Sequence, residues 1–299
     1  VGSEMCIRDR KAGFEVKHEQ FAINDRLATA FSPMSLKTGR EADMKETMEW
    51  FDIVKPHFFR APLDNDKGFG NWIAKDWKNN RLDSPETATV KPLDAKRNAD
   101  GTVTVTTTQE CRYANGKITT DYVYTMDADG SVDFSATYTP EGQLPPLPCI
   151  GNTFLMDKDM TRLSWYGQGL QDSYVDRLEA TSIGRWTSSV DQEYVHYPRP
   201  QSSGNHEQTV TLSLTDAKGR GYTVTTANAT PFAFSALPYS EHQLSTVAHD
   251  CDLHTENNVF LNIDAAMMGL GNSSCGPGVL TKYSIPQKQH SLHVMFKRK

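Results

Sequence analysis

The sequence predicts an all-β protein with a few short helices. Many short segments alternate apolar and polar residues and are rich in β-branched and aromatic side chains, a pattern typical of strands with one buried face. Gly, Asn, Asp and Pro separate these segments at short intervals, whereas stretches with helical periodicity are few. With 299 residues, 37% of them hydrophobic, the chain can form one large core or two modest ones. No internal repeat is evident, so a propeller or solenoid is not expected, while a sandwich and a barrel both stay open.

The N-terminal part of the sequence divides into two segments. Residues 1–10 read VGSEMCIRDR, lack the apolar stretch of a signal peptide, and resemble a sequencing-library adapter read through in frame. We therefore expect the natural protein to extend further upstream, which leaves its localisation open between cytoplasm and periplasm. Residues 11–54 form a polar lead-in, in which 14–23 alternates like a strand and 40–50 suits a short helix. The main domain is expected to span residues 55–299.

An amphipathic helix is expected early in this domain, at residues 72–82. Trp72 and Trp77 lie too far apart to share one helical turn. We expect one of them to face the core and the other to make a domain contact.

A meander of three antiparallel strands is expected next, at residues 102–109, 117–126 and 131–139. Asn115-Gly116 and Asp129-Gly130 separate them, and these dipeptides are strong signals for hairpin turns. One face of such a meander is buried.

The remaining elements follow a stiff Pro-rich linker, QLPPLP, at residues 143–148. A short helix with Ser240 as its N-cap is expected at 240–249. Further strands are expected at 150–156, 162–166, 209–214, 222–226, 232–235, 259–263, 279–283 and 291–296.

Composition excludes several classes of partner. The net charge is -6 and no basic stripe is present, so no nucleic-acid partner is expected. No apolar run approaches the roughly 20 residues of a membrane span, so no membrane partner is expected. The five cysteines show no CxxC spacing, which argues against a zinc site or a disulfide framework and leaves a single disulfide open. His206, His242, His249 and His254 show no repeated ligand spacing, so no metal site is expected in this chain.

The stretch richest in chemistry is residues 57–72, reading HFFRAPLDNDKGFGNW. Arg60 offers a rigid fork of donors, Pro62 fixes the backbone, and three polar side chains follow directly. For Arg60, a buried Arg–Asp pair that staples a turn is as good an explanation as a functional role. For the stretch as a whole, we interpret it as a rigid polar loop beside a sugar pocket, followed by a mobile flap.

RAPLDND, within this stretch, resembles the motif that opens the last domain of β-galactosidases of glycoside hydrolase family two. Five further segments resemble the same family in the same order: WYGQGLQDSYVDR at 165–177, GRW at 184–186, PQ…GN at 200–205, FSALPYSEHQL at 234–244 and GLGNSSCGPGVL at 269–280. The resemblance covers the chain from about residue 55 onward. It implies a large antiparallel super-sandwich similar to galactose mutarotases.

The resemblance also implies what the chain does. The parent enzyme would hydrolyse terminal β-D-galactosides with retention, using two glutamates on an upstream (β/α)₈ barrel. No alternating βα pattern occurs here, so no catalytic residue is expected in this chain, and Glu110, Glu141, Glu193, Glu207 and Glu256 are interpreted as surface carboxylates. The expected partners are the barrel of the same parent and a β-galactoside, with the question of a homo-oligomer left open. No cofactor is expected in this chain, because the Mg or Na of the family belongs to the barrel.

Substrate-binding residues are expected in two loops. From the first loop, the resemblance implies Asp64, Asn65 and Asp66, with Gly68 as the hinge of a flap; the alternative is that Gly68 only relieves a tight turn. From the second loop it implies Asn272, Ser274 and Cys275. Cys275 stands where the family usually has a tryptophan, and since a thiol cannot stack on a sugar, we expect it to be inert and Asn272, Ser273 and Ser274 to bind sugar hydroxyls.

Two of these family segments carry structural expectations. Trp165 is expected in the core, and Asp176 and Arg177 are expected to form a staple. Ser202 stands where the family usually has a glutamate.

The alternative is a stand-alone carbohydrate-binding or mutarotase-like module. It would need a closed pocket with a His/Glu acid–base pair, which the spacing of the sequence does not reveal. The completion-domain hypothesis instead predicts an exposed apolar face near Phe58, Phe59 and Trp72, where the barrel would dock.

Overall fold

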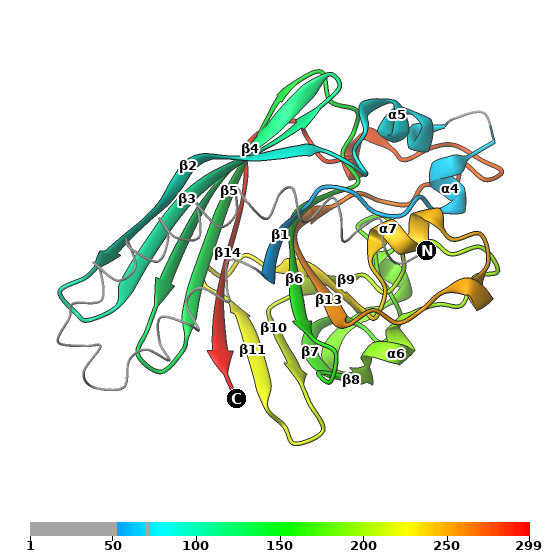
Figure 1. Ribbon diagram of the computed structural model, residues 1–299. Helices are drawn as coiled ribbons and strands as arrows, with labels where there is room; N and C mark the ends of the chain where they lie inside the picture. The colour runs from blue at the N-terminus through cyan, green and yellow to red at the C-terminus, as the bar shows by residue number, and fades with distance from the viewer. Residues whose placement is uncertain (1–52, 70–71) are drawn as a thin grey trace.

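The computed structural model describes residues 53–69 and 72–299, and the expectations for residues 1–52 lie outside this part. Two antiparallel sheets face each other and form a large β-sandwich, which confirms the predicted fold class (Figure 1). The five-stranded sheet has the order β1-β6-β13-β12-β9, with bounds β1 Val54–His57, β6 Cys149–Asp157, β13 Asn258–Met267, β12 Phe232–Leu237 and β9 His206–Thr209. The nine-stranded sheet has the order β2-β3-β4-β5-β14-β11-β10-β7-β8, with bounds β2 Glu86–Arg97, β3 Val103–Tyr113, β4 Gly116–Met126, β5 Val132–Gly142, β14 His290–Arg298, β11 Gly221–Thr226, β10 Thr211–Thr215, β7 Arg162–Gly169 and β8 Ser182–Ser189.

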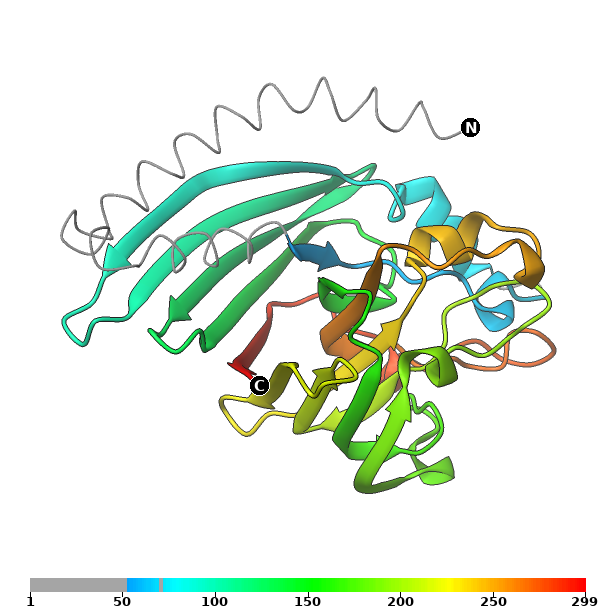
Figure 2. The ribbon, with the colours of Figure 1, turned by 60° about the horizontal axis from the view of Figure 1, so that its bottom comes forward.

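The larger sheet curves around the smaller one (Figure 2). The short helices α4 Asp64–Lys67, α5 Ile73–Asn80 and α7 Glu241–Thr246 gather at one end of the sandwich, beside the loop that follows β13 (Figure 1). A fourth helix, α6 Val190–Glu193, follows β8. This grouping brings segments that are far apart in the sequence to one edge of the molecule.

The predicted meander is confirmed as β3, β4 and β5, whose turns lie at or beside the two expected dipeptides. Strand β2 extends this meander by one strand that the sequence did not reveal. Its side chains are exposed along most of its length and it contains Pro92, which is tolerated at the edge of a sheet. Without a buried face, β2 carries no alternating pattern.

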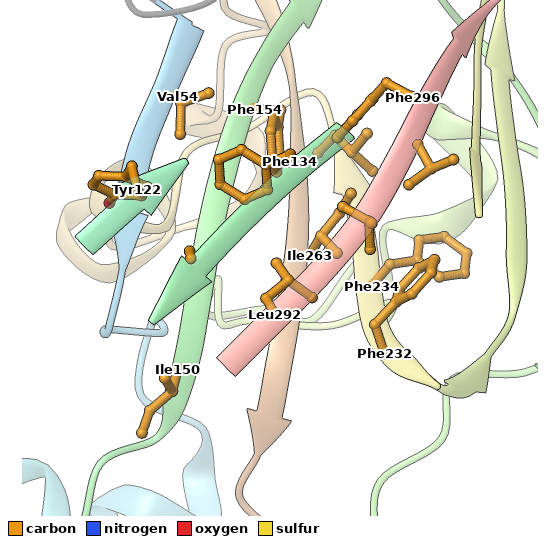
Figure 3. Close-up of a cluster of buried hydrophobic side chains, with 14 of the residues drawn as sticks. Val54, Tyr122, Phe134, Ile150, Phe154, Phe232, Phe234, Ile263, Leu292 and Phe296 are labelled. Carbon is orange, nitrogen blue, oxygen red and sulfur yellow. The ribbon is translucent and has the colours of Figure 1, made fainter. Parts of the chain in front are cut away.

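Aliphatic and aromatic side chains together fill the core between the sheets, as Figure 3 shows. Phe154 of β6 contacts Phe134 edge-on, with ring centroids 5.3 Å apart, and Phe296 of β14 at 4.8 Å. These contacts join the two sheets directly. Trp165 is buried and packs on Phe234, as expected for a core aromatic.

Two expectations for local elements need correction. Residues 279–283 do not form a strand, because the chain there closes into a 3₁₀ turn, Thr281–Tyr283, with the Tyr283 N–H donating to the carbonyl of Leu280. The predicted helix at 240–249 is confirmed only as α7, which ends at Thr246. Its N-cap is confirmed, since the Ser240 hydroxyl accepts from the Gln243 N–H.

The expected apolar docking face is only partly present. Phe58 is buried and packs edge-on against Tyr138, so the expectation that it would be exposed is wrong. Phe59 is partly buried against the same core. Trp77 of α5 is buried and its indole N–H donates to the carbonyl of Pro146, while Trp72, directly before α5, is 57% exposed.

Candidate functional site

Arg60 is buried under the first loop and holds it by hydrogen bonds. Its guanidinium is buried and grips Asp66 with two nitrogens, Nε at 3.2 Å and Nη2 at 2.9 Å. These two bonds engage both carboxylate oxygens, and a third bond to Asp66 comes from the Leu63 N–H, which donates to Oδ2 at 3.0 Å. The other arm of Arg60 donates to the carbonyl of Met268 at 3.0 Å. The buried Arg–Asp pair is therefore confirmed, and it also joins this loop to the end of β13.

Asn65 joins the first loop to the second. Its amide nitrogen donates to the carbonyl of Gly271 at 2.9 Å, and its amide oxygen accepts from the backbone N–H and the hydroxyl of Ser274 at 3.2 and 2.6 Å. The Phe69 N–H adds a further bond between the loops, to the carbonyl of Ser273 at 2.7 Å. The two loops thus form one hydrogen-bonded unit.

Asp176 and Arg177 hold the second loop from its other side. The Asp176 carboxylate accepts from the N–H groups of Leu270 and Gly271, and Arg177 donates to the Gly271 carbonyl. The staple differs from the expected one: Asp176 and Arg177 each bind the second loop, and no ion pair between the two is found among the described residues. Gly269 leaves room for this contact, because an added Cβ would lie 2.8 Å from the Asp176 carboxyl carbon.

A third segment, residues 200–206, supports the first loop. The Gln201 side chain accepts from the Asp64 N–H at 2.9 Å. Glu241, the first residue of α7, accepts from the Ala61 N–H with one oxygen and from the Ser202 hydroxyl, at 3.0 Å, with the other. Burial raises the pKa of Glu241. Ser202 therefore shares a carboxylate supplied by α7.

The predicted site residues come together but differ in exposure. The side chains of Asp64, Asn272, Ser274 and Cys275 are exposed, and Asn65 is half-buried. Asp66 and Ser273 are buried. Gly68 has φ 57° and ψ 170°, a conformation that favours glycine. Phe69 was not among the predicted residues, although it is 91% exposed and follows this glycine directly.

Three of the five glutamates interpreted as surface carboxylates are buried, so that interpretation is wrong for them. Glu110 lies under Arg112 and Lys117, each 2.6 Å away. Glu193 pairs with His206 Nε2 at 2.6 Å. Glu207 is enclosed beside Asn205, and burial raises its pKa to about 8. The bonding partners lie within 13 residues of each glutamate, but its burial depends on how the surrounding elements pack, which sequence alternation does not show.

Besides the pair of Arg60 and Asp66, three strands of the five-stranded sheet, β1, β6 and β13, supply a second buried polar group. His57 Nδ1 is 2.7 Å from Asp264 Oδ1, and its other ring nitrogen is 3.8 Å from the Cys149 sulfur. Burial alone would lower the pKa of His57, but the Asp264 carboxylate raises it well above the usual value. Burial raises the pKa of Cys149 to about 11, so this thiol is protonated and inert. Opposite ring nitrogens face the two partners, so His57 bridges Asp264 and Cys149, and the ligand atoms of the three residues lie within 4.8 Å of one another.

The four described cysteines are free. In the described ranges, no helix is long and apolar enough to cross a membrane.

Fold and site together define a large antiparallel β-sandwich protein with a polar, loop-built site at one end. Comparison with known proteins gives its family. The chain belongs to the β-galactosidase small-chain family, whose model matches residues 31–296.

The curated relatives that this chain resembles include several β-galactosidases. A β-galactosidase of Streptococcus thermophilus is 32% identical over 73% of this chain and 21% of its own length. The β-galactosidase BgaC of Bifidobacterium adolescentis is 35% identical over 60% of this chain and 17% of its own length. The chain thus spans about a fifth of the length of these relatives.

Among solved structures, a galactose mutarotase related enzyme from Lactobacillus acidophilus is similar, with a TM-score of 0.36 and 10% identity over 70% of this chain and 71% of that chain. A putative aldose 1-epimerase of Escherichia coli K12 has a TM-score of 0.33 and 10% identity, over 70% of this chain and 69% of that one.

Proposed function

We propose that this chain is the last domain of a longer β-galactosidase, that it completes the active site of an upstream catalytic barrel, and that it does not hydrolyse galactosides alone. The observation that carries this proposal is the joining of two distant loops through Asn65, with Asp64, Asn272 and Ser274 left exposed on the joined surface. Family membership and the small share of each relative that the chain spans support it.

The loop residues divide into two roles. Asp64, Asn272 and Ser274 bind sugar hydroxyls, because carboxylate, amide and hydroxyl groups suit such ligands and these three are exposed. Asn65 and Asp66 position the loops, since their polar atoms are used within the protein. Gly68 is the hinge of the flap, because its backbone tolerates conformations that other residues do not. Cys275 is exposed and contributes little to binding.

Metal ions are assigned to the barrel of the parent and not to this domain. The first loop offers a poor ligand set for Mg²⁺ or Na⁺, because both carboxylate oxygens of Asp66 accept hydrogen bonds from Arg60 and the Leu63 N–H. Trp72 is assigned to the contact with the barrel, as an exposed aromatic at the start of α5.

A mutarotase-like activity is the second candidate, because the structure contains a His/Glu pair, His206 with Glu193. Catalysis by this pair would require access to a sugar. His206 is buried, however, and packs against the rings of both Trp165 and Phe234, with centroids at 4.4 and 5.0 Å. The pair is closed off by the core, so the completion-domain function is preferred.

The test is hydrolysis of o-nitrophenyl β-galactoside by the purified chain, alone and mixed with the barrel-containing part of the Streptococcus thermophilus relative. We expect no activity alone and activity that rises with added chain in the mixture. Hydrolysis by the chain alone would contradict the proposal, because it would require a nucleophile and an acid within this domain. Aldose epimerase activity of the chain alone would support the second candidate instead.

A further inference from the structure

Phe69 is the most exposed large hydrophobic side chain in the described residues. Its 91% exposure compares with 57% for Trp72, the next highest. A phenylalanine ring in water forgoes the favourable burial that most aromatic side chains obtain, so a ring presented this fully invites a functional explanation.

The backbone beneath this ring is hydrogen-bonded to both loops in this structure, whereas the ring itself extends into solvent. The Gly68 N–H donates to the carbonyl of Asp64 at 2.9 Å and closes α4. Gly68 then turns the chain with its positive φ, and the Phe69 N–H donates to the carbonyl of Ser273 at 2.7 Å. The ring is therefore held at the junction of the two loops. A side chain at the tip of an unattached loop would not have this anchor.

Polar groups surround the junction. Ser274 donates its hydroxyl to Asn65 and keeps acceptor capacity, while the Asn272 amide oxygen accepts from Arg177 at 3.3 Å. The amide nitrogen of Asn272 has no partner among the described residues, and its side chain is exposed. The junction thus combines one free aromatic ring with exposed amide and hydroxyl groups.

This combination matches the chemistry of a pyranose. One face of a β-galactoside presents apolar C–H groups and its rim presents hydroxyls, so a ring and neighbouring polar groups can bind both at once. Cys275, exposed in the same loop, has no flat surface to offer.

We propose that the Phe69 ring is the stacking surface for the galactoside and sets the affinity of the completed site for substrate. The inference rests on the proposed function and assigns a specificity-determining residue within it. Stacking acts on bound substrate before the reaction, so it affects KM more than kcat.

The test uses the full chain mixed with the barrel-containing part of the Streptococcus thermophilus relative. Phe69→Ala, Phe69→Leu and Phe69→Trp are compared with wild type, and Tyr166→Ala, an exposed ring on β7, is the matched control. We expect Phe69→Ala and Phe69→Leu to raise KM for o-nitrophenyl β-galactoside about tenfold with a smaller change in kcat, because both lose the ring. Phe69→Trp and Tyr166→Ala should keep the KM of wild type.

Three results would overturn the inference. The first is an unchanged KM in Phe69→Ala while wild-type mixtures are active, which would leave the proposed function intact. The second is that Phe69→Ala leaves KM unchanged but needs a higher concentration of the chain to reach half-maximal activity. This result would place Phe69 in the contact with the barrel.

The third result covers the case in which wild-type mixtures are inactive and the proposed function fails. Saturation-transfer NMR then measures contacts between the chain and methyl β-galactoside. Transfer to the sugar that disappears in Phe69→Ala and persists in Phe69→Trp would support the stacking role. No contact between sugar and the Phe69 ring would overturn it.

Discussion

His57 and Asp264 meet across a glycine, on three neighbouring strands of the five-stranded sheet. His57 of β1 pairs in register with Gly151 of β6, which pairs with Asp264 of β13. The side chains of the outer two reach over Gly151 and come within 2.7 Å of each other. An added Cβ at Gly151 would lie 2.2 Å from Asp264 Oδ1. The glycine is therefore what permits this buried pair to form.

Gly151→Ala is expected to destabilise the fold by about 2–4 kcal/mol, because the methyl group must displace the Asp264 carboxylate from a buried site. Urea denaturation followed by fluorescence measures the change. Gly276→Ala, in an exposed loop where the nearest atom to an added Cβ is 3.2 Å away, is the control and should change stability by less than about 1 kcal/mol. Equal effects of the two variants would contradict the role given to Gly151.

Arg60→Ala is expected to cost about 3–5 kcal/mol of stability, because it leaves the buried Asp66 carboxylate without its cation. Arg220→Ala removes an exposed partner of Asp216 and should cost less than about 1 kcal/mol. Thermal denaturation of both variants, compared with wild type, gives the contrast. A small loss for Arg60→Ala would show that the loop does not depend on the pair.

Ser202→Glu is expected to destabilise the protein by roughly 1–3 kcal/mol, because it places a second carboxylate against Glu241. Ser202→Ala, which removes the hydroxyl without adding charge, should cost about 1 kcal/mol. Since protonation relieves the repulsion, the deficit of Ser202→Glu should shrink as pH falls from 7 to 5. A deficit that stays constant over this range would argue against carboxylate repulsion.

Glu207→Gln tests the buried acid. The pKa of Glu207 is about 8 in the folded state, raised by burial, so the folded protein binds a proton that the unfolded chain releases above its ordinary pKa of 4.5. Its contribution to stability is complete below the unfolded pKa and is lost as pH rises to about 8. Wild type should therefore lose stability across this window at up to about 1.4 kcal/mol per pH unit relative to Glu207→Gln. Denaturation curves at intervals from pH 4.5 to 8 measure the difference, and parallel pH profiles would show that Glu207 is not protonated in the fold.

The alternation of apolar and polar residues predicted those strands that have one buried face and one exposed face. Strands β3, β4 and β5 bury alternate residues against the core, so their sequence alternates visibly. Strand β2 is exposed at the edge and has no such pattern. Residues 279–283 read like a strand, but their hydrogen bonds close a local turn.

The loops of the site could be predicted because sequence motifs mark them. The buried polar residues could not be predicted, because their burial depends on the packing of distant strands. RAPLDND and the glycine-rich loop indicated the two segments that Asn65 joins. The burial of Glu207 and the meeting of His57 with Asp264, 207 positions apart, depend on how distant strands are placed. No local pattern carries that information.

The double attachment of the two loops, through Asn65 and through the Phe69 N–H, has a consequence for protein engineering. In a chimaera that takes only one of the two loops from a relative, the donors and acceptors that now bond across the junction would lose their matching partners. The hydrogen bonds of the junction should therefore be kept only when residues 60–69 and 269–276 are exchanged as a pair.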